Sequence, residues 1–458
     1  MRQTSFGFTQ PTPTGVNFDG AGVNGFAPPD NDGVVGPNHY IQMINVQFSI
    51  YDKTGRLLFG PARNSALFAA LGGDCAGHND GDPIVKYDQL ADRWVLTQFL
   101  VGGSTSFSHQ CVALSVTGDP LGAYYLYDFP TGPSVFVDYP HWGVWPDSYY
   151  MTAHLFNTAG TAYLGQGVLA YDRLSMLAGL PAGFQFINLA VVNPNWGGAL
   201  PTDLDGLTPP PPGSPNYVIA PGAPELDSSA SDVLHVFQAR ATWGASPSFT
   251  ITGPTDVATS GFIANLCGVS RACIPEPPPA TAADYVDAIS DRLMYRIAYR
   301  NFLPDHESLV LNHTVNVAVS GVHAGVRWYE VRSPSSPTIF QEGTYAPDTS
   351  NRWMASIAMD NSGDMALGYS KSDTGIFPEI DITGRLSSDG AGTMGSEVLM
   401  KAGLGSQTGT GNRWGDYSYM SVDPTDGCTF WYTNQYEQAS GSFNWSTRIA
   451  SFRFPSCV

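Results

Sequence analysis

Charged side chains are scarce in this sequence, at 13% of its 458 residues, compared with roughly 25% in ordinary soluble domains. Lysine is the least frequent basic residue and occurs only as Lys53, Lys86, Lys371 and Lys401. The 21 lysines and arginines are outnumbered by 40 acidic residues, which gives a formal net charge of −19. A surface of this sign repels polyanions, so we expect no nucleic-acid partner.

Long apolar runs are also missing. No stretch reaches the ~18 apolar residues that a membrane-spanning helix needs, so we expect no membrane insertion. The segment from Met1 to Thr14 is polar and contains proline, without the apolar centre of a signal peptide. We therefore expect that the signal peptide is absent and that the sequence starts at the mature form of a secreted protein.

The cysteines lack the Cys-x-x-Cys spacing, which gives little support to a zinc site or a thioredoxin-like centre. Their number, six, is even, as in proteins whose cysteines form disulfides in an oxidising compartment. Six cysteines permit fifteen connectivities, and local placement favours Cys75–Cys111, Cys267–Cys273 and Cys428–Cys457. We expect a secreted, extracellular protein; the alternative is a cytoplasmic protein with six reduced thiols.

Amphipathic helical patterns are nearly absent, and short strand patterns take their place. The 50 glycines and 35 prolines indicate many turns, and the 12% aromatic content favours strands. One unit recurs: a short apolar strand, a turn that contains aspartate, and a second strand rich in aromatic residues. Its clearest copies begin at Ile84, Trp142, Ser356 and Tyr419.

The aspartates in these turns have a structural explanation. A short carboxylate accepts hydrogen bonds from backbone N–H groups inside a tight turn. We therefore assign a structural role to Asp88, Asp147, Asp360 and Asp423.

These observations predict an all-β fold, a single β-propeller of seven four-stranded blades that spans residues 1–458. Residues 1–30 would form an N-terminal extension that helps to close the ring, because closure hides the blade edges. The innermost strands are expected near 40–46, 83–88, 142–146, 202–206, 293–300, 354–360 and 417–423. A double β-sandwich is the alternative, but it does not explain seven similar units.

The segment from Gly81 to Asp88, followed by Arg93 and Trp94, resembles the blades of secreted sialidase-like (BNR-type) propellers. The resemblance is at the level of the strand–turn–strand unit. The sialidase Asp-box, Ser-x-Asp-x-Gly-x-x-Trp, is not present, and Ser388 to Gly392 comes no closer than a glycine-rich turn. The resemblance implies a fold and a tendency toward glycan chemistry, and it assigns no catalytic residue.

Residues just before the inner strands of a propeller lie on one common face, and here they are rich in functional groups. The catalytic candidates are Asp82, Asp138, Tyr139, His141 and Asp416, and the substrate-binding candidates are His39, Arg292, Arg352, Trp353, Arg413 and Trp414. The alternative is that these charges pair between blades and close the ring, because buried charges are costly unless paired. Arg292, Arg296 and Arg300 alternate on one strand, where they either pair with acidic residues or bind the carboxylate of a sugar acid.

Asp80 and Asp82 offer oxygen ligands to a metal, so Ca²⁺ is a possible cofactor, and no organic cofactor is expected. Hydrolysis of a glycan needs two carboxyl groups across the scissile bond, and a lyase needs a neutralised uronate and a base. We expect a polysaccharide or glycan ligand, with a glycoside hydrolase or a polysaccharide lyase for an acidic polysaccharide as the candidate enzymes. The alternative is a non-catalytic propeller that binds carbohydrate or another surface, with Trp142, Trp353 and Trp414 exposed as stacking platforms, or a purely structural one.

Overall fold

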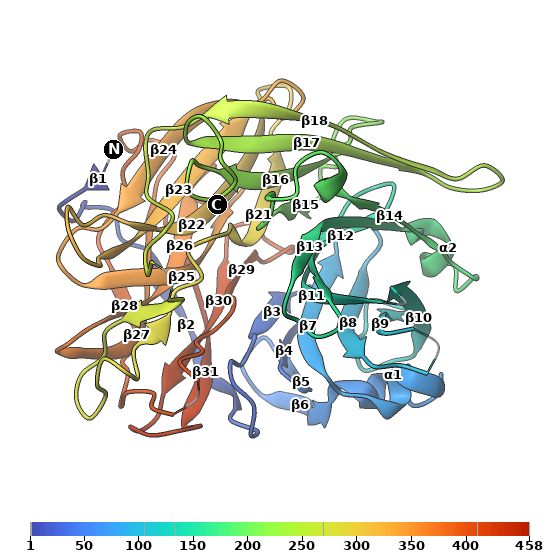
Figure 1. Ribbon diagram of the computed structural model, residues 1–458, viewed down its shortest axis with the longest axis horizontal. Coiled ribbons are helices and arrows are strands. Elements are labelled where there is room, and N and C mark those ends of the chain that lie inside the picture. The colour runs from blue at the N-terminus through green and yellow to red at the C-terminus, as the bar shows by residue number, and fades with distance from the viewer. Residues whose placement is uncertain (1, 105, 133, 269, 410, 458) are drawn as a thin grey trace.

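The computed structural model describes residues 2–104, 106–132, 134–268, 270–409 and 411–457. Most of the described chain forms antiparallel sheets (Figure 1), which confirms the all-β class. The helices of the described residues are short: η1 (Asn64–Phe68), α1 (Gly73–Gly77), α2 (Arg173–Leu177) and η2 (Leu189–Val191). Among these residues no helix has the length and apolar character required to cross a membrane.

Five of the sheets in the described part of the chain consist of four strands each, and three of these follow one another directly along residues 32–188. The first contains β3 (Asp32–Val35), β4 (His39–Ile44), β5 (Gln47–Asp52) and β6 (Leu57–Arg63). The second contains β7 (Gly81–Asp88), β8 (Arg93–Val101), β9 (Ser108–Ser115) and β10 (Tyr124–Gly132). The third contains β11 (Val135–Val144), β12 (Tyr149–Asn157), β13 (Tyr163–Tyr171) and β14 (Phe184–Asn188). Further along, β25 (Asn351–Met359), β26 (Met365–Asp373), β27 (Ile376–Arg385) and β28 (Val398–Lys401) form another.

A nine-stranded sheet combines two further groups of four antiparallel strands. One group is β15 (Leu200–Asp205), β16 (Asn216–Gly222), β17 (Val233–Thr242) and β18 (Ser248–Ala258). The other is β21 (Met294–Asn301), β22 (Glu307–Asn316), β23 (Ala324–Arg332) and β24 (Thr338–Tyr345). The two groups meet where β15 pairs in parallel with β21, and β1 (Arg2–Gln3) pairs with β24. A separate two-stranded sheet consists of β19 (Ala272–Ile274) and β20 (Val286–Asp287).

The last group joins the two ends of the chain. Strands β29 (Tyr419–Val422), β30 (Phe430–Glu437) and β31 (Trp445–Arg453) come from the C-terminal region. The fourth strand is β2 (Thr12–Gly22), which pairs antiparallel with β31. The blue N-terminal strand β2 therefore lies beside the red strands in Figure 1.

The first strands of these groups contact one another in cyclic order. Along this order β3 contacts β7, β7 contacts β11, β11 contacts β15, β15 contacts β21, β21 contacts β25, β25 contacts β29, and β29 contacts β3. This succession of four-stranded sheets is a propeller-like arrangement. In each group of four strands the first strand lies at the centre and the last strand lies at the outside.

The observed first strands correct one of the predicted ranges. The range 40–46 falls on β4, the second strand of its sheet, because the shorter β3 (Asp32–Val35) precedes it. The other six predicted ranges overlap β7, β11, β15, β21, β25 and β29. The turn aspartates also behave largely as expected: Asp88 accepts from the backbone N–H groups of Leu90 and Ala91, and Asp360 from those of Ser362 and Asp364. Asp147 differs, because its carboxylate accepts from the Tyr150 hydroxyl and the backbone of Ala241.

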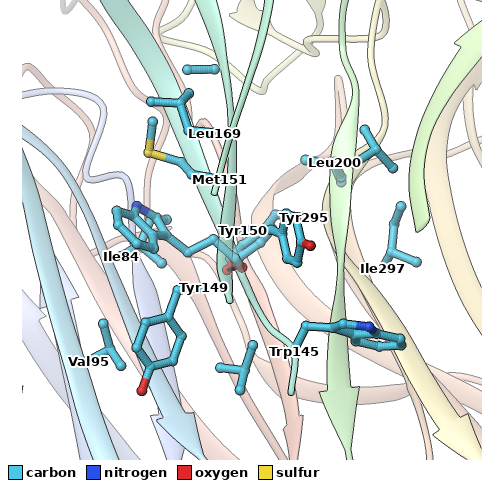
Figure 2. Packing of buried hydrophobic residues seen from close by; sticks show 14 of the residues in the cluster. Ile84, Val95, Trp145, Tyr149, Tyr150, Met151, Leu169, Leu200, Tyr295 and Ile297 are labelled. Carbon is cyan, nitrogen blue, oxygen red and sulfur yellow. Dashed lines mark hydrogen bonds between the residues drawn. The ribbon is translucent and has the colours of Figure 1, made fainter. Parts of the chain in front are cut away.

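Large side chains fill the space between neighbouring sheets. Figure 2 shows Tyr149, Tyr150 and Met151 of β12 beside residues contributed by β7, β8, β13, β15 and β21. Trp145 and Tyr295 are completely buried there. Burial of aromatic side chains of this size supplies much of the stability of such a fold, at roughly 25 cal/mol per Å² of apolar surface.

All three predicted disulfides are present. Cys75 bonds to Cys111, Cys267 to Cys273, and Cys428 to Cys457. Disulfides of this kind are typical of extracellular proteins.

The disulfides should differ in their effect on stability, because a bridge that closes a longer loop restricts the unfolded chain more. The sequence separation is 36 residues for Cys75–Cys111 and 6 for Cys267–Cys273. We expect the double substitution Cys75→Ala/Cys111→Ala to lower the free energy of unfolding by roughly 4 kcal/mol, and Cys267→Ala/Cys273→Ala by roughly 2 kcal/mol. Urea unfolding curves of the two variants measure this difference, and a larger loss for the short loop would contradict the loop-entropy explanation.

Candidate functional site

Five residues with a left-handed backbone conformation lie close to the N-terminal ends of the central strands. Asp30, Asp82, Tyr139, Met354 and Asp416 have φ values of 47°, 42°, 56°, 52° and 64°. We call this end the strand-start rim. A residue other than glycine costs about 1–2 kcal/mol in this conformation, and such strain concentrates at functional sites.

Hydrogen bonds between neighbouring sheets bring these residues to one place. The backbone N–H of Asp30 donates to the carbonyl oxygen of Gly415 at 3.0 Å. The backbone N–H of Tyr139 donates to Oδ2 of Asp82 at 3.0 Å, and the Tyr139 hydroxyl donates to the carbonyl oxygen of Asp416 at 3.2 Å. The structure therefore places Asp82, Tyr139 and Asp416 together, although they are far apart in sequence.

Four aspartates at the rim form a carboxyl cluster: Asp30, Asp82, Asp138 and Asp416. Burial, together with the charge of Asp138, raises the pKa of Asp82 to about 8. Burial and the neighbouring charges of Asp416 and Asp82 raise the pKa of Asp30 well above its usual range. The cluster thus combines a protonated carboxyl group with further carboxyl groups near neutral pH.

Two arginines flank the carboxyl cluster. Arg413 forms an ion pair with Asp416, and Arg292 donates two hydrogen bonds to Asp291, at 2.8 and 2.9 Å. The guanidinium of Arg292 also lies over the ring of Tyr139, 4.7 Å from its centroid. Both arginines are therefore at the rim, as the sequence predicts, and both already have an acidic partner.

A cleft opens beside Arg292. One cavity of about 290 Å³ is lined by His154, Tyr163, Asp227, Asp291 and Arg292, among others. A second cavity of about 240 Å³ shares Leu226 and Asp291 with it. Burial and the charge of Arg292 lower the pKa of His154 well below its usual range, so this imidazole is neutral. The cleft offers neutral and charged hydrogen-bonding groups beside an aromatic ring.

Sequence reasoning missed Asp30 and His154. Asp30 precedes β3, and the strand prediction began only at residue 40, so nothing marked it as a position at the rim. His154 belongs to β12, the second strand of its sheet, and reaches the cleft only through the packing of the sheets. The proline-proline-aspartate sequence that ends at Asp30 was the one available signal, because it indicates a turn before a strand.

Several predicted substrate-binding residues cannot contact a ligand. Trp353 and Trp414 are fully buried, with ring centroids 6.0 Å apart, and Nε1 of Trp414 donates to the Ser370 hydroxyl. Trp142 is buried as well and stacks on Tyr171. The structure thus contradicts a role for these tryptophans as exposed stacking platforms; they form the core because each large apolar ring gains more from burial than from a place on the rim.

Arg352 is also fully buried, so its prediction as a substrate-binding residue is wrong. Its guanidinium contacts Asp348 and Glu397, and Nη1 donates to the carbonyl oxygen of Ser350 at 2.9 Å. The N–H groups of its guanidinium are therefore bonded to acceptors inside the protein and not to a ligand. Arg352 therefore forms structural ion pairs, as in the alternative that charged residues near the strand starts pair with one another.

The two predicted histidines occupy different places. His39 begins β4 and pairs with Asp52, at the end of its sheet opposite to Asp30, so the structure does not bring it to the carboxyl cluster. His141 lies next to the cluster, with its ring 4.2 Å from that of Tyr139, but it is completely buried. Burial lowers the pKa of His141 to about 3, so it is a neutral group beneath Tyr139.

The proposed calcium ligands Asp80 and Asp82 have different partners. Oδ2 of Asp80 accepts from the backbone N–H of Val101 at 2.8 Å, and Oδ2 of Asp82 accepts from that of Tyr139. Among the described residues, the one group of three acidic, histidine or cysteine ligands at metal-binding separations is Cys75, Cys111 and Asp128, and its two sulfurs form a disulfide. Calcium at Asp80 and Asp82 stays a prediction.

Two of the three arginines that alternate just before and along β21 pair with aspartates. Arg292 pairs with Asp291, and Arg296 pairs with Asp203 and Asp205, deep in the centre. Arg300 instead donates from Nε to the carbonyl oxygen of Met359 at 2.9 Å. The structural alternative for Arg296 is correct, although its partners come from β15 of the neighbouring group.

The raised pKa of Asp82 has a consequence for stability. Its carboxyl group holds a proton up to a pH of about 8 in the folded protein, but only to about 3.8 in the unfolded chain. The resulting stabilisation is complete below pH 3.8, decreases as the pH rises, and is lost once the pH passes about 8. We expect the melting temperature to fall between pH 4 and pH 8, and to fall less in Asp82→Asn, which cannot ionise. Thermal unfolding of both proteins in EDTA measures this, and equal slopes would contradict the assignment.

Comparison with known proteins gives a likeness in fold alone. No family model matches the chain, and no curated protein matches it. Similar solved structures include a fungal alcohol oxidase of the AA5 family (11% identity, 99% of this chain and 75% of that chain, TM-score 0.44). They also include a Hadza microbial sialidase (11% identity, 92% and 74%, TM-score 0.39) and an endo-arabinase from Bacteroides thetaiotaomicron (11% identity, 68% and 95%, TM-score 0.30). A sialidase is thus among the similar structures, and no activity follows for this chain from likenesses at this level.

Proposed function

We propose that the protein is a secreted, single seven-bladed β-propeller that binds and hydrolyses a glycan at the strand-start rim. The cyclic contacts from β3 through β29 and back to β3 support the seven blades. Strand β2 (Thr12–Gly22) closes the ring by pairing with β31. The three disulfides support secretion.

The observation that carries the catalytic proposal is the convergence of Asp82, Asp138 and Asp416 from three segments of the chain. None of the three lines the cleft, which adjoins the cluster through Arg292 and the ring of Tyr139. Glycoside hydrolysis needs one carboxyl group that keeps its proton and one that is ionised. Asp82 is the candidate acid, which protonates the glycosidic oxygen. Asp416, paired with Arg413, is the candidate carboxylate that activates water or attacks the sugar.

The cleft beside Arg292 would hold the sugar. Tyr163 and His154 offer ring faces and hydrogen-bonding groups, and Asp291 and Asp227 accept hydrogen bonds from hydroxyl groups. Lyase chemistry has less support, because Arg292 is already paired with Asp291 and is not free to neutralise a uronate.

The test is incubation with a panel of neutral and acidic polysaccharides, with two products followed in parallel. Hydrolysis releases reducing ends without the ultraviolet absorbance of unsaturated sugars, and this is the expected result. Absorbance of unsaturated products would instead identify a lyase. Absence of both across the panel would reject the catalytic proposal.

A second candidate is a glycan-binding protein without catalysis. It is favoured by one observation: the flanking arginines Arg292 and Arg413 are each paired with an aspartate of their own segment, as expected of residues that fix the shape of the rim. Binding of an oligosaccharide without turnover in the same panel would identify this function.

A further inference from the structure

A buried arginine without an acidic partner lies at the end of the central strands that is opposite to the strand-start rim. Arg300, near the end of β21, is 4% exposed. Among the residues that the structure describes, no aspartate or glutamate lies within ion-pairing distance of its guanidinium, whereas Arg296 on the same strand has two aspartate partners. Because a buried charge is costly unless it is paired, the charge of Arg300 needs a partner.

The hydrogen bonds of Arg300 leave part of its guanidinium free. Nε donates to the carbonyl oxygen of Met359 at 2.9 Å, and Nη1 donates to Oδ1 of Asn361. Nη2 is buried and has no hydrogen-bond partner in the described part of the chain. Buried donors normally have a partner, and a water molecule or an ion fills that place where the protein supplies none.

A cavity adjoins this free nitrogen. Its volume is about 250 Å³, which is below the ~300–1,000 Å³ of pockets for drug-sized ligands. Besides Arg300, it is lined by Gln89, Gly206, Asn361 and Asp423, each within two residues of the end of β7, β15, β25 or β29. The cavity therefore lies where the central strands end, at the opening opposite to the carboxyl cluster.

The carboxyl groups closest to Arg300 do not cancel its charge. Oδ2 of Asp205 is paired with Arg296. Burial, together with the charge of Asp364, raises the pKa of Asp360 to about 7, so this group is largely protonated in mildly acidic solution. Burial lowers the pKa of Arg300 in spite of the charges of Asp205 and Asp360. The positive charge beside the cavity thus remains uncompensated.

The acidic residues in the cavity wall have partners of their own. Asp423 forms an ion pair with Lys53 at 2.7 Å. Oδ1 of Asp426 accepts from the backbone N–H groups of Cys428 and Thr429 at 2.8 and 2.9 Å. Two carboxylates in the wall still repel a divalent anion more than a monovalent one. The charge balance therefore suits an anion of single charge.

Gln89 adds a second polar atom without a partner. Its Oε1 is buried and has no hydrogen-bond partner among the described residues. Polar cavities contain water or a ligand, whereas empty cavities are apolar. Water would hydrate Arg300 but would leave its charge uncompensated. A carboxylate supplies a negative charge together with two acceptor oxygens, and its hydrogen bonds to a guanidinium are strong.

We propose that this cavity binds a small carboxylate anion of single charge, with Nη2 of Arg300 as its main donor. The bound anion neutralises Arg300 and links the chain segments that follow β7, β15, β25 and β29. It uses Arg300 alone, because Arg292 and Arg296 are paired with aspartates. The site is separate from the carboxyl cluster and does not depend on the proposed glycosidase activity.

The test is thermal unfolding of the full-length protein at pH 6, with sodium acetate replacing sodium chloride at constant ionic strength. We expect a saturable rise in melting temperature of a few degrees, because acetate binds the folded protein alone. Sodium sulfate at the same ionic strength should have no such effect. Arg300→Gln should weaken acetate binding by roughly tenfold or more.

Arg385→Gln is the matched control. Arg385 is 2% exposed and also lacks an acidic partner within ion-pairing distance among the described residues, but its guanidinium donates to the carbonyl oxygens of Thr393 and Asp389 at 3.1 and 2.7 Å. It does not line the cavity. Acetate should therefore stabilise Arg385→Gln as much as the wild type.

Saturation-transfer NMR of the acetate methyl protons on the wild type gives a second measurement, which does not require a folded variant. We expect a transfer signal that unlabelled formate suppresses by competition. Absence of this signal, together with equal melting temperatures in acetate and chloride, would overturn the proposal. Undiminished acetate binding in Arg300→Gln, or stronger stabilisation by chloride or sulfate than by acetate, would also overturn it.

Discussion

Replacement of Asp82 by asparagine lowers glycan turnover by roughly 10²- to 10⁴-fold, the usual contribution of a general acid. Asparagine has nearly the same shape and keeps an oxygen that can accept from the backbone N–H of Tyr139. It cannot donate a proton to the leaving group. The measurement is kcat on the polysaccharide that the panel identifies, together with the melting temperature of the variant.

The pH profile distinguishes this role from a structural one. A protonated Asp82 predicts that wild-type turnover falls as the pH rises above about 8, and that the residual activity of Asp82→Asn lacks this limb. Asp80→Asn, whose side chain contacts Val101 away from the cluster, is the control and should keep wild-type turnover. Unchanged turnover in a folded Asp82→Asn variant would remove Asp82 from the catalytic role.

The second large effect concerns stability. Arg296→Met should lower the free energy of unfolding by about 3–5 kcal/mol, because it leaves buried acids without their partner. Arg296 is 1% exposed and pairs with Asp203 at 3.1 Å and with Asp205 at 2.5 Å. Its Nε also donates to the carbonyl oxygen of Met420, on the central strand β29.

An exposed ion pair provides the comparison for this variant. Arg56 pairs with Asp52 at 3.0 Å, but its side chain is 74% exposed. Arg56→Met should therefore cost no more than about 1 kcal/mol. Urea unfolding of the two variants measures both values, and a similar small loss for Arg296→Met would mean that the central ion pairs do not hold the sheets together.

The recurring strand–turn–strand unit was enough to predict the all-β fold. Alternation of apolar residues and the turn aspartates Asp88 and Asp360 are local signals, and the structure confirms both. The first inner strand was misplaced because β3 is only four residues long and has no second strand pattern before it. Disulfide pairing was predictable because each pair is close in sequence.

The site was predictable only in part. That Asp82, Asp138, Tyr139 and Asp416 come together could be predicted, because residues that precede central strands meet at one rim. Their catalytic role stays a prediction. Burial could not be predicted: Trp353 and Trp414 occupy similar sequence positions, yet they lie in the core.

The most direct measurement of the central claim is hydrogen exchange of Asp82→Asn with and without the oligosaccharide that the panel identifies. The account predicts slower exchange in peptides that cover residues 135–144, 289–294 and 411–422, which form the rim and the cleft. Peptides around 205–209 and 424–428, at the opposite ends of the central strands, should be unaffected. Protection confined to that opposite end, or no protection at saturating oligosaccharide, would contradict a glycan site at the strand-start rim.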